Sequence, residues 1–305
     1  MIQNQSNEIN LSQILNPWFV TGFSDAEGCF FIDIQKSNKV RTNWEVQPEF
    51  KIELHAKDII LLKLIQEFFN GIGKITQKGE KIAYHVKSLK DLKVIISHFE
   101  NYPIITNKYA DYVLFKSIVQ LMISKEHLTE EGLLKILSLK ASLNNGLSEE
   151  LKKHFPNISP ISRPSVGETS IEDPQWLSGF ASGEGCFLID TYKSKTTLGV
   201  GVTLRFKLAQ HSRDSNLMKS LEQYLGCGTY YSKSTQNVGE FVVAKFSDIK
   251  HKIIPFFDRN LILGIKSLDF SDFKQAAELI ENKSHLTQSG LEQILSIKAG
   301  MNRGR

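Results

Sequence analysis

The chain contains two copies of one sequence pattern, and this duplication constrains its fold more than any other feature. Residues 22–33 (GFSDAEGCFFID) and residues 179–190 (GFASGEGCFLID) agree at eight of twelve positions, at an offset of 157 residues. Residues 127–146 recur at residues 285–304 with twelve of twenty positions identical, at an offset of 158. Because the two offsets nearly coincide, the chain is predicted to hold two copies of a whole domain.

The length fits this interpretation, since 305 residues correspond to two domains of about 150 residues each. We place the first domain at residues 1–150, a linker at residues 151–172 and the second domain at residues 173–305. Residues 156–172 hold three of the eight prolines. Proline fixes φ and a Ser/Gly-rich sequence packs poorly, so this segment is expected to connect the domains.

Each copy is expected to begin with a helix. The dipeptides Asn16-Pro17 and Asp173-Pro174 are typical helix starts, because the first side chain caps the helix and proline is tolerated at the first helical position. The helices are expected to end at Gly28 and Gly185, since glycine readily adopts the left-handed conformation that often terminates a helix.

The segments after these helices alternate with period two. Phe30, Ile32 and Ile34 alternate with Phe31, Asp33 and Gln35, and the second copy shows a similar alternation in residues 202–208. One apolar face indicates a sheet that is covered on one side only. We therefore predict an α+β protein with two pseudo-symmetric α-β-β-α-β-β-α(α) repeats, each with a four-stranded antiparallel sheet. The uncovered faces are either solvated or a platform for a ligand, and the duplication favours a platform.

Composition narrows the class of protein without deciding it. Hydrophobic residues make up 41% and charged residues 23%, which is ordinary for a soluble globular protein. We expect no membrane span, no signal or transit peptide and no disulfide or zinc framework. The net charge is +4, from 17 Lys and Arg against 18 Asp and Glu (−1) in residues 1–150 and 20 against 15 (+5) in residues 151–305. Any basic surface must therefore be balanced by acidic surface elsewhere.

Two equivalent glutamates, Glu27 and Glu184, are the candidate chemical groups. Each is expected at the carboxyl end of its helix, where a carboxylate is disfavoured by about 0.3–1 kcal/mol and needs compensation. If the first helices of the two copies pack together, both carboxylates and the helix-end carbonyls would form the oxygen-rich kind of site that Mg²⁺ prefers. The alternative is that both are exposed helix ends retained by duplication. Cys29 and Cys186, beside these glutamates, are expected to lie in the core.

The segments WFVTGFSDAEGCF and WLSGFASGEGCF resemble the two defining motifs of the LAGLIDADG homing endonucleases, in their single-chain, two-repeat form. Further segments, including HFENYPIITNKYADYVLFK and QHSRDSNLMKSLEQYLGCG, resemble the I-OnuI-like subgroup. The similarity runs from about Asn16 to Arg305. It implies a saddle-shaped protein whose two antiparallel sheets lie in the DNA major groove and whose motif helices form the interface between the halves.

The resemblance also implies roles for particular residues. Glu27 and Glu184 would bind Mg²⁺ beside the scissile phosphates, with the backbone carbonyls of Ala26 and Gly183 as further ligands. Mn²⁺ would substitute for Mg²⁺, whereas Ca²⁺ would support binding without cleavage. The two strands would be cut across the minor groove to leave 3′ overhangs.

The resemblance also suggests two residues near the metal that would assist the reaction. Gln210 matches a family position that orders water, but Leu54 stands at the equivalent place in the first copy. Lys245 is the candidate transition-state lysine, and either Lys87 or Lys90 is its counterpart.

The expected DNA-contacting residues fall into two groups. Loop residues between strands are expected to contact phosphates, and they are Lys36, Asn38, Lys39, Arg41, Lys193, Ser194 and Lys195. Residues of the uncovered sheet faces are expected to read bases, and they are Lys51, Thr203, Arg205 and Lys207.

The function that we infer is that of a monomeric, metal-dependent, site-specific double-strand DNA endonuclease with a long, non-palindromic target. It would need no protein partner. The mitochondrion is the expected compartment, because genes of this family typically lie in organellar introns. The alternatives are an RNA-binding intron maturase on the same scaffold and a DNA-binding module without catalysis. The intact glutamates in both motifs favour the nuclease.

Overall fold

The computed structural model describes residues 15–167, 170–195, 197–233 and 237–304. The chain divides into two units, Met1–Gly167 and Glu168–Arg305, and each has its own hydrophobic core. Within the described part of the chain, no helix combines the length and apolar character that crossing a membrane requires.

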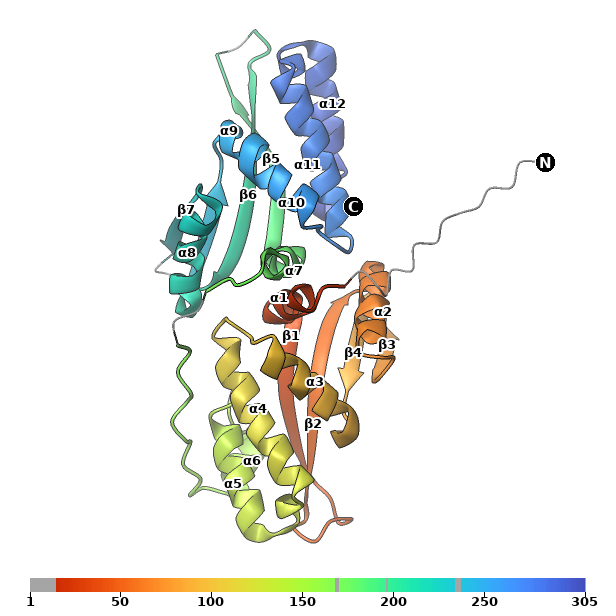
Figure 1. The fold of residues 1–305 in the computed structure, drawn as a ribbon, viewed down its shortest axis with the longest axis vertical. Helices are drawn as coiled ribbons and strands as arrows, with labels where there is room; N and C mark the ends of the chain where they lie inside the picture. The colour runs from red at the N-terminus through yellow and green to blue at the C-terminus, as the bar shows by residue number, and fades with distance from the viewer. Residues whose placement is uncertain (1–14, 168–169, 196, 234–236, 305) are drawn as a thin grey trace, which may run out of the picture. The chain divides into compact units, whose positions relative to one another are not determined.

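The first unit contains one antiparallel sheet with strand order β1-β2-β4-β3. Helices α3 and α4 cross one face of this sheet (Figure 1). Its elements in chain order are α1 (Pro17–Glu27), β1 (Gly28–Lys36), β2 (Trp44–His55), α2 (Ile59–Phe68), β3 (Lys74–Lys78), β4 (Lys81–Val86), α3 (Leu89–Asn101), α4 (Lys108–Ile123), α5 (Glu130–Ala141) and α6 (Glu149–His154).

The second unit repeats this arrangement with strand order β5-β6-β8-β7. Its elements are α7 (Pro174–Glu184), β5 (Gly185–Lys193), β6 (Val200–His211), α8 (Ser215–Leu225), β7 (Thr229–Lys233), β8 (Val238–Val243), α9 (Phe246–Asp248), a π-helical turn (Ile249–Ile253), α10 (Ile254–Arg259), α11 (Lys266–Glu281) and α12 (Gln288–Ala299). The α+β prediction with two antiparallel four-stranded sheets is confirmed.

The end of each repeat differs from the predicted pattern, because three helical regions follow the last strand instead of one or two. In the first unit these regions are α3, α4 and α5, and the short helix α6 follows them after the end of the repeated part. A short non-helical segment that includes Pro103 separates α3 from α4. Proline lacks a backbone N–H and restricts the conformation of the residue before it. The helical region after β4 is therefore divided into two helices at this segment.

The helix starts follow the prediction. The side chain of Asn16 accepts a hydrogen bond from the backbone N–H of Trp18 (2.8 Å), and the side chain of Asp173 accepts one from Gln175 (2.8 Å). Proline is at the beginning of both helices. These caps satisfy backbone donors that have no partner within the helix.

The glycines that end these two helices act for a different reason from the predicted one. Gly28 has φ −72° and Gly185 has φ −69°, so neither is left-handed. A Cβ at Gly28 would lie 2.6 Å from the carbonyl oxygen of Ser24, and one at Gly185 would lie 2.4 Å from that of Ala181. In each unit the chain therefore turns from helix into strand at a position that has no space for a side chain.

Buried residues follow the predicted period-two alternation in the first strand of each sheet. In β1, Phe30, Ile32 and Ile34 are buried, whereas Phe31 is exposed. The ring of Phe30 packs against four aromatic rings from β2, α3 and α4. Phe187 in the second unit makes the equivalent aromatic cluster. Each core therefore fixes the first strand against the helices that cover it.

The segment predicted as a linker, residues 151–172, is partly folded against the first unit. It begins within α6, and Phe155 packs against Trp44. Further along, Arg163 donates hydrogen bonds to both carboxylate oxygens of Asp111 (2.9 and 2.8 Å). A charge pair to a buried carboxylate is a specific contact, so this stretch does not behave as a free tether.

Candidate active site

The two candidate glutamates stand at equivalent positions in the two units. Glu27 is the last residue of α1 and Glu184 is the last residue of α7, as predicted. Both side chains are half-buried. We call α1 and α7 the motif helices.

A lysine contacts the end of each motif helix. The ammonium group of Lys108 donates hydrogen bonds to the carbonyl oxygens of Ser24 (3.0 Å) and Ala26 (3.2 Å). The ammonium group of Lys266 donates one to the carbonyl oxygen of Gly183. The carboxyl end of a helix is partially negative, so these cations supply the compensation that a glutamate at this end requires.

A second contact holds each lysine-bearing segment against its motif helix. Asp25 is buried and accepts hydrogen bonds from the backbone N–H groups of Ile105 (3.1 Å) and Thr106 (3.2 Å), and from the Thr106 hydroxyl (2.6 Å). In the second unit, the hydroxyl of Ser182 accepts from the N–H of Leu263 (3.0 Å). These loops lead into α4 and α11, so they fix where Lys108 and Lys266 begin their helices.

Lys108 and Lys266 are not among the site residues predicted from the sequence, although the duplication contained a signal for them. Residues 108–116 (KYADYVLFK) align with residues 266–274 (KSLDFSDFK) at the same offset of 158, with Lys, Asp, Phe and Lys at matching places. The lysines lie about eighty residues from the motifs in sequence. Their proximity therefore follows only from the folded loops.

Lys245, the lysine predicted from the sequence, is not the one that contacts a motif-helix end. Lys245 is at the start of α9, two residues after the end of β8. Strand pairing places Val243 opposite Phe206 and Val86 opposite Phe50, so Lys245 corresponds to Ser88, which caps α3. Neither Lys87 nor Lys90 is therefore its counterpart in this register.

Gln210 and Leu54 are equivalent in strand register, as expected. Gln210 follows Phe206 and Leu208 in the alternation of β6, so it belongs to the helix-covered face rather than the open one. Its side-chain oxygen accepts a hydrogen bond from the backbone N–H of His211 (2.8 Å). This contact gives the amide a local role at the end of the strand.

The oxygen atoms at the motif-helix ends suit a hard divalent cation. Each unit offers one carboxylate and one adjacent carbonyl, from Glu27 with Ala26 and from Glu184 with Gly183. Mg²⁺ commonly takes one or two carboxylates and completes its shell with water and substrate phosphate. No group of three or more His, Cys, Asp or Glu side chains able to hold a metal occurs among the described residues. The donor set thus fits a cation that is shared with a substrate.

The two neighbouring thiols are not in the core, contrary to expectation. Cys29 is exposed and Cys186 is half-buried. Desolvation of the sulfur atoms raises the pKa of both thiols, with Lys108 opposing the shift at Cys29. Neutral thiols are poor ligands for hard cations, so the oxygen donors remain the candidates.

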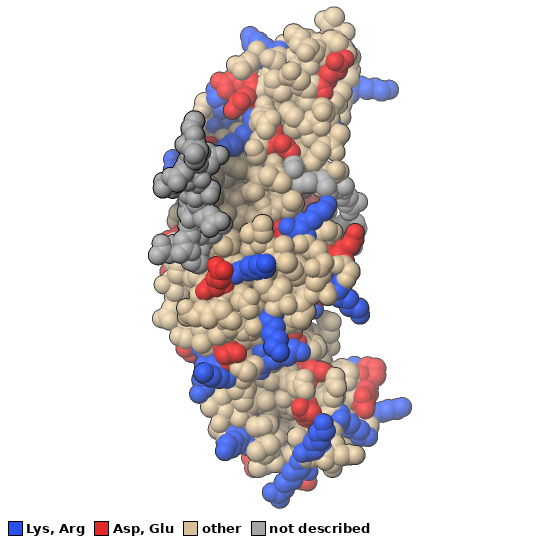
Figure 2. Space-filling view, turned by 90° about the vertical axis from the view of Figure 1, so that its right-hand side faces the viewer, with Lys and Arg blue, Asp and Glu red and all other residues tan. Residues whose placement is uncertain are grey.

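The uncovered sheet faces carry the four predicted base-reading residues. Strand pairing sets Lys51 opposite Cys29 and Lys207 opposite Cys186, while Thr203 and Arg205 share the same face as Lys207. Along β2 of the first unit, Glu49, Lys51 and Glu53 alternate in sign. Figure 2 shows basic and acidic side chains interspersed on the side of the molecule that it presents.

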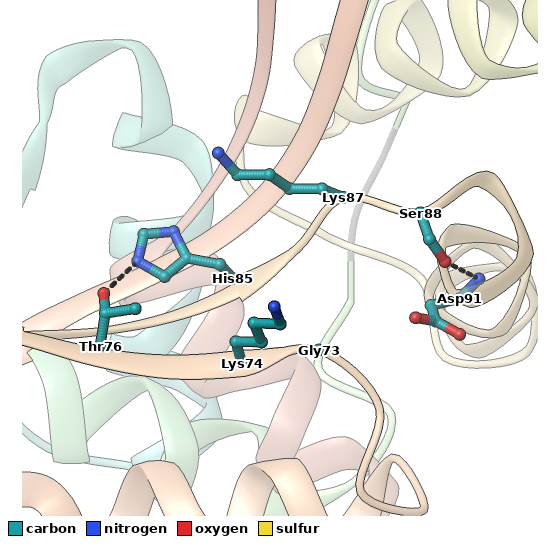
Figure 3. Close-up of a pocket in the computed structure, with 7 residues that line it drawn as sticks. All are labelled: Gly73, Lys74, Thr76, His85, Lys87, Ser88 and Asp91. Carbon is teal, nitrogen blue, oxygen red and sulfur yellow. Dashed lines mark hydrogen bonds between the residues drawn. The ribbon is translucent and has the colours of Figure 1, made fainter.

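In the first unit, the open face centres on Glu49. Its side chain is 13% exposed, and it contacts His85 Nδ1 and Lys87 Nζ (3.4 Å). His85 also hydrogen-bonds to Thr76 (2.8 Å). A cavity of about 620 Å³ opens here, and Figure 3 shows His85 directed toward Thr76, with Lys74, Lys87, Ser88 and Asp91 around the same space. The pocket therefore presents donors and acceptors together.

In the second unit, Arg205 takes the place of Glu49, because Arg205 lies opposite Leu188 as Glu49 lies opposite Phe31. Arg205 pairs with Asp190 and lowers the pKa of that carboxyl group. Lys207 lies 3.8 Å from Glu240. The two open faces thus carry opposite charges at one equivalent position.

The predicted phosphate-contacting residues of the loops differ in their exposure and contacts. Lys193 and Lys195 are exposed at the β5–β6 connection, and Ser194 is half-buried there. Asn38, Lys39 and Arg41 are exposed in the β1–β2 connection. Lys36 differs from the rest, because its ammonium group lies 2.9 Å from His154 Nε2 in α6 and over the ring of Trp44. It therefore fastens α6 to the end of the sheet.

A family model described as "LAGLIDADG endonuclease" matches residues 20–119 and 177–277, which contain most of each motif helix with its glutamate, both lysines and both sheets. The chain belongs to the LAGLIDADG endonuclease family. The two matched ranges correspond to the two units, so the duplication seen in the sequence is the repeat of this family.

Two similar proteins come from the fungus Neurospora crassa. The chain is 44% identical to "Probable intron-encoded endonuclease 2" of Neurospora crassa over 297 residues, which is 93% of this chain and 64% of that protein. It is 38% identical to "Probable intron-encoded endonuclease 3" of the same fungus, covering 92% of this chain and 53% of that protein. The chain thus spans between half and two thirds of the length of these relatives.

Solved LAGLIDADG structures share the fold. The I-SmaMI homing endonuclease bound to cleaved DNA is 45% identical, with a TM-score of 0.94 and coverage of 95% of this chain and 98% of that one. The I-GzeII homing endonuclease in complex with its DNA target is 43% identical, with a TM-score of 0.90 and coverage of 95% and 99%. Other I-SmaMI structures contain uncleaved DNA with calcium ions, or carry alanine in place of one or two lysines.

Proposed function

We propose that this protein is a site-specific double-strand DNA endonuclease that depends on a divalent metal. The observation that carries the proposal is the repeated arrangement at the motif-helix ends. In each unit a glutamate ends the helix, and a lysine from another helix contacts the neighbouring carbonyls. Duplicated hydrolytic groups suit a substrate with two strands to cut.

Double-stranded DNA is the proposed substrate, because solved relatives are bound to DNA. The open sheet faces would read bases, since a two-stranded ribbon or sheet edge fits the major groove and presents side chains to base edges. The exposed loop residues, such as Lys39, Arg41, Lys193 and Lys195, would contact phosphates. Because the two faces differ in charge, the target is proposed to be non-palindromic.

Mg²⁺ is the proposed cofactor, with Mn²⁺ as a substitute and Ca²⁺ as an ion that supports binding without cleavage. Glu27 and Glu184, with the carbonyls of Ala26 and Gly183, would hold the metal. When bound, the metal would activate water and stabilise the leaving oxygen. The structure of I-SmaMI with uncleaved DNA and calcium ions supports the part of this proposal that concerns Ca²⁺.

Lys108 and Lys266 are proposed to act in place of Lys245 as the cationic groups of the reaction. Their ammonium groups lie beside the carbonyls that neighbour the glutamates, so they can face a phosphate placed at the same carboxylate. A preorganised cation there stabilises the negative charge that develops during hydrolysis. The I-SmaMI homing endonuclease has been solved with alanine in place of two lysines, which supports the choice of a pair of lysines as candidates.

The biological setting is proposed from the relatives. Several are named for introns, including one in intron 1 of ND4 in Podospora anserina. Intron homing in the mitochondrion, by a monomeric nuclease that leaves 3′ overhangs, is the corresponding proposal for this chain.

The test is replacement of each carboxylate by its isosteric amide. Glu27→Gln and Glu184→Gln should abolish cleavage of a duplex selected from a random library in Mg²⁺, because the amide lacks the charge that holds the metal. Binding to the same duplex in Ca²⁺ should persist. Glu67→Gln, at an exposed position near the end of α2, is the matched control and should cleave normally. Cleavage at the normal rate by either motif variant would exclude these residues as ligands.

A further inference from the structure

An asparagine in a left-handed conformation follows the last long helix of each unit. Asn144 follows α5 with φ 49°, and Asn302 follows α12 with φ 54°. Asparagine tolerates this conformation better than most residues, but it still costs more than an ordinary backbone geometry. Two copies of the same unusual residue therefore point to a shared role of its side chain and backbone.

Each asparagine makes the same two hydrogen bonds. The backbone N–H of Asn144 donates to the carboxylate of Asp111 (2.9 Å), and its side-chain amide donates to the carbonyl oxygen of Phe30 (2.7 Å). In the second unit, Asn302 donates to Asp269 (2.9 Å) and to the carbonyl oxygen of Phe187 (3.1 Å). We call each set of two bonds an asparagine bridge.

The bridges connect the two parts of the candidate active site. Asp111 lies one helical turn after Lys108 in α4, and Asp269 lies one turn after Lys266 in α11. Phe30 and Phe187 are the third residues after the motif glutamates, in β1 and β5. Each bridge therefore ties the helix that carries the lysine to the strand that begins directly after the glutamate.

Both ends of each bridge are held firmly. Asp111 and Asp269 are buried, with 4% and 6% of their surface exposed. The rings of Phe30 and Phe187 are packed into the aromatic cores. In the first unit, Arg163 adds two hydrogen bonds to Asp111. A small shift at the asparagine would thus be transmitted to the start of α4 or α11 instead of being absorbed.

We propose that Asn144 and Asn302 are positioning residues for the nuclease reaction. Each sets the first turn of its lysine-bearing helix against the end of the motif helix, and so places Lys108 or Lys266 relative to Glu27 or Glu184. This inference rests on the proposed function, because it concerns the rate of DNA cleavage. Neither asparagine needs to touch DNA or metal in this role.

The test removes one bond of each bridge and keeps the backbone conformation. Asn144→Gly and Asn302→Gly retain the N–H to the aspartate and the left-handed geometry, but lose the bond to the β-strand carbonyl. Asn302→Gly also loses a weak contact, in which the side-chain oxygen of Asn302 accepts from Cys186 Sγ (3.6 Å). The full chain is assayed under single-turnover conditions in Mg²⁺, on a supercoiled plasmid that carries a selected target with separately labelled strands. Asn70→Gly is the control, because Asn70 also has a positive φ (56°), in the turn after α2.

Each bridge variant should slow one strand about 10-fold to 100-fold, since small misplacement of a reacting group costs that much. The two variants should affect opposite strands. Affinity in Ca²⁺ and the melting temperature should stay close to those of Asn70→Gly. The ratio of the two strand rates is the decisive readout, because general loss of folded protein lowers both rates together.

Equal slowing of both strands would overturn the inference, and so would slowing no greater than in Asn70→Gly. If one bridge variant fails to fold, the strand ratio of the other carries the test alone. Failure of the proposed function looks different, because the unmodified chain would then cut no duplex in the library.

Discussion

The two units are alike at the carboxyl ends of their motif helices. Lys108 in the first unit and Lys266 in the second donate hydrogen bonds to equivalent backbone carbonyls there. On the open sheet faces the two units diverge, with Glu49 in the first where Arg205 stands in the second. The units are thus alike at the ends of their motif helices and differ on their open faces. The proposed function accounts for this, because each unit would cut one strand and read a different half of the target.

The cores also differ close to the motif helix. In the first unit His98 is buried and hydrogen-bonds to Thr21 of α1 (3.1 Å). The equivalent residue in the second unit is Phe256, whose carbonyl accepts from Asn260 as that of His98 accepts from Tyr102. One unit therefore contains a titratable group at a place where the other is aromatic and neutral.

Removing the lysines at the motif-helix ends should change DNA cleavage more than the other substitutions. Lys108→Met and Lys266→Met should each lower the single-turnover cleavage rate about 100-fold, because each removes a preorganised cation. The two variants should act on opposite strands, measured with separately labelled strands in Mg²⁺. Lys116→Met and Lys274→Met are matched controls in the same two helices, where the lysines pair with Glu100 and Asp258. Equal effects on both strands would contradict one lysine per strand.

The next prediction uses acid to separate the units. Burial lowers the pKa of His98 to about 3, below its ordinary value near 6.5. The unfolded chain therefore binds the proton more readily, and stability that is present above pH 6.5 is lost as the pH falls, by about 1.4 kcal/mol per pH unit until the folded pKa is approached.

Hydrogen exchange at pH 7 and pH 5 should reveal this loss in β1 and β2 but not in β5 and β6. His98→Phe, which copies the second unit, should make the first unit respond less to pH. His251→Phe, at an exposed position, is the control. An unchanged pH response in His98→Phe would assign the acid sensitivity to other groups.

Substitutions on the open sheet faces should change the preference for particular bases of the target, with a smaller effect than the substitutions above. A carboxylate accepts from the amino groups of cytosine or adenine, whereas arginine donates to guanine. Glu49→Gln and Arg205→Gln should each change preference at one position, in different halves of the target, near the lower end of the usual ~1–3 kcal/mol. Selection of cleaved duplexes measures this, with Glu80→Gln at the exposed β3–β4 turn as control. Diffuse changes over many positions would exclude direct reading by these residues.

Much of the fold was predictable because its signals are local. The caps of Asn16 and Asp173 depend on neighbouring residues, and the alternation around Phe30 depends on a period of two. The motif glutamates were identified from duplication together with the family resemblance. These features are contained in short segments, so a single sequence reveals them.

The rest of the site depends on contacts between distant segments. Lys108 reaches the motif helix only because Asp25 holds the loop before α4. Lys36 was grouped with phosphate-contacting residues from its loop position, yet α6 folds back against it. Gly28 was assigned a left-handed role, whereas steric closeness to Ser24 is the cause. No local pattern reports such distances.

The contact between Arg163 and Asp111 has a practical consequence for protein engineering. A designer who wished to produce the first unit alone, or to split the chain into two separately expressed fragments, would naturally cut where the repeat ends, near residue 150. That cut would strip the arginine from a buried carboxylate and Phe155 from Trp44. The fragment boundary that respects the folded structure lies after Gly167.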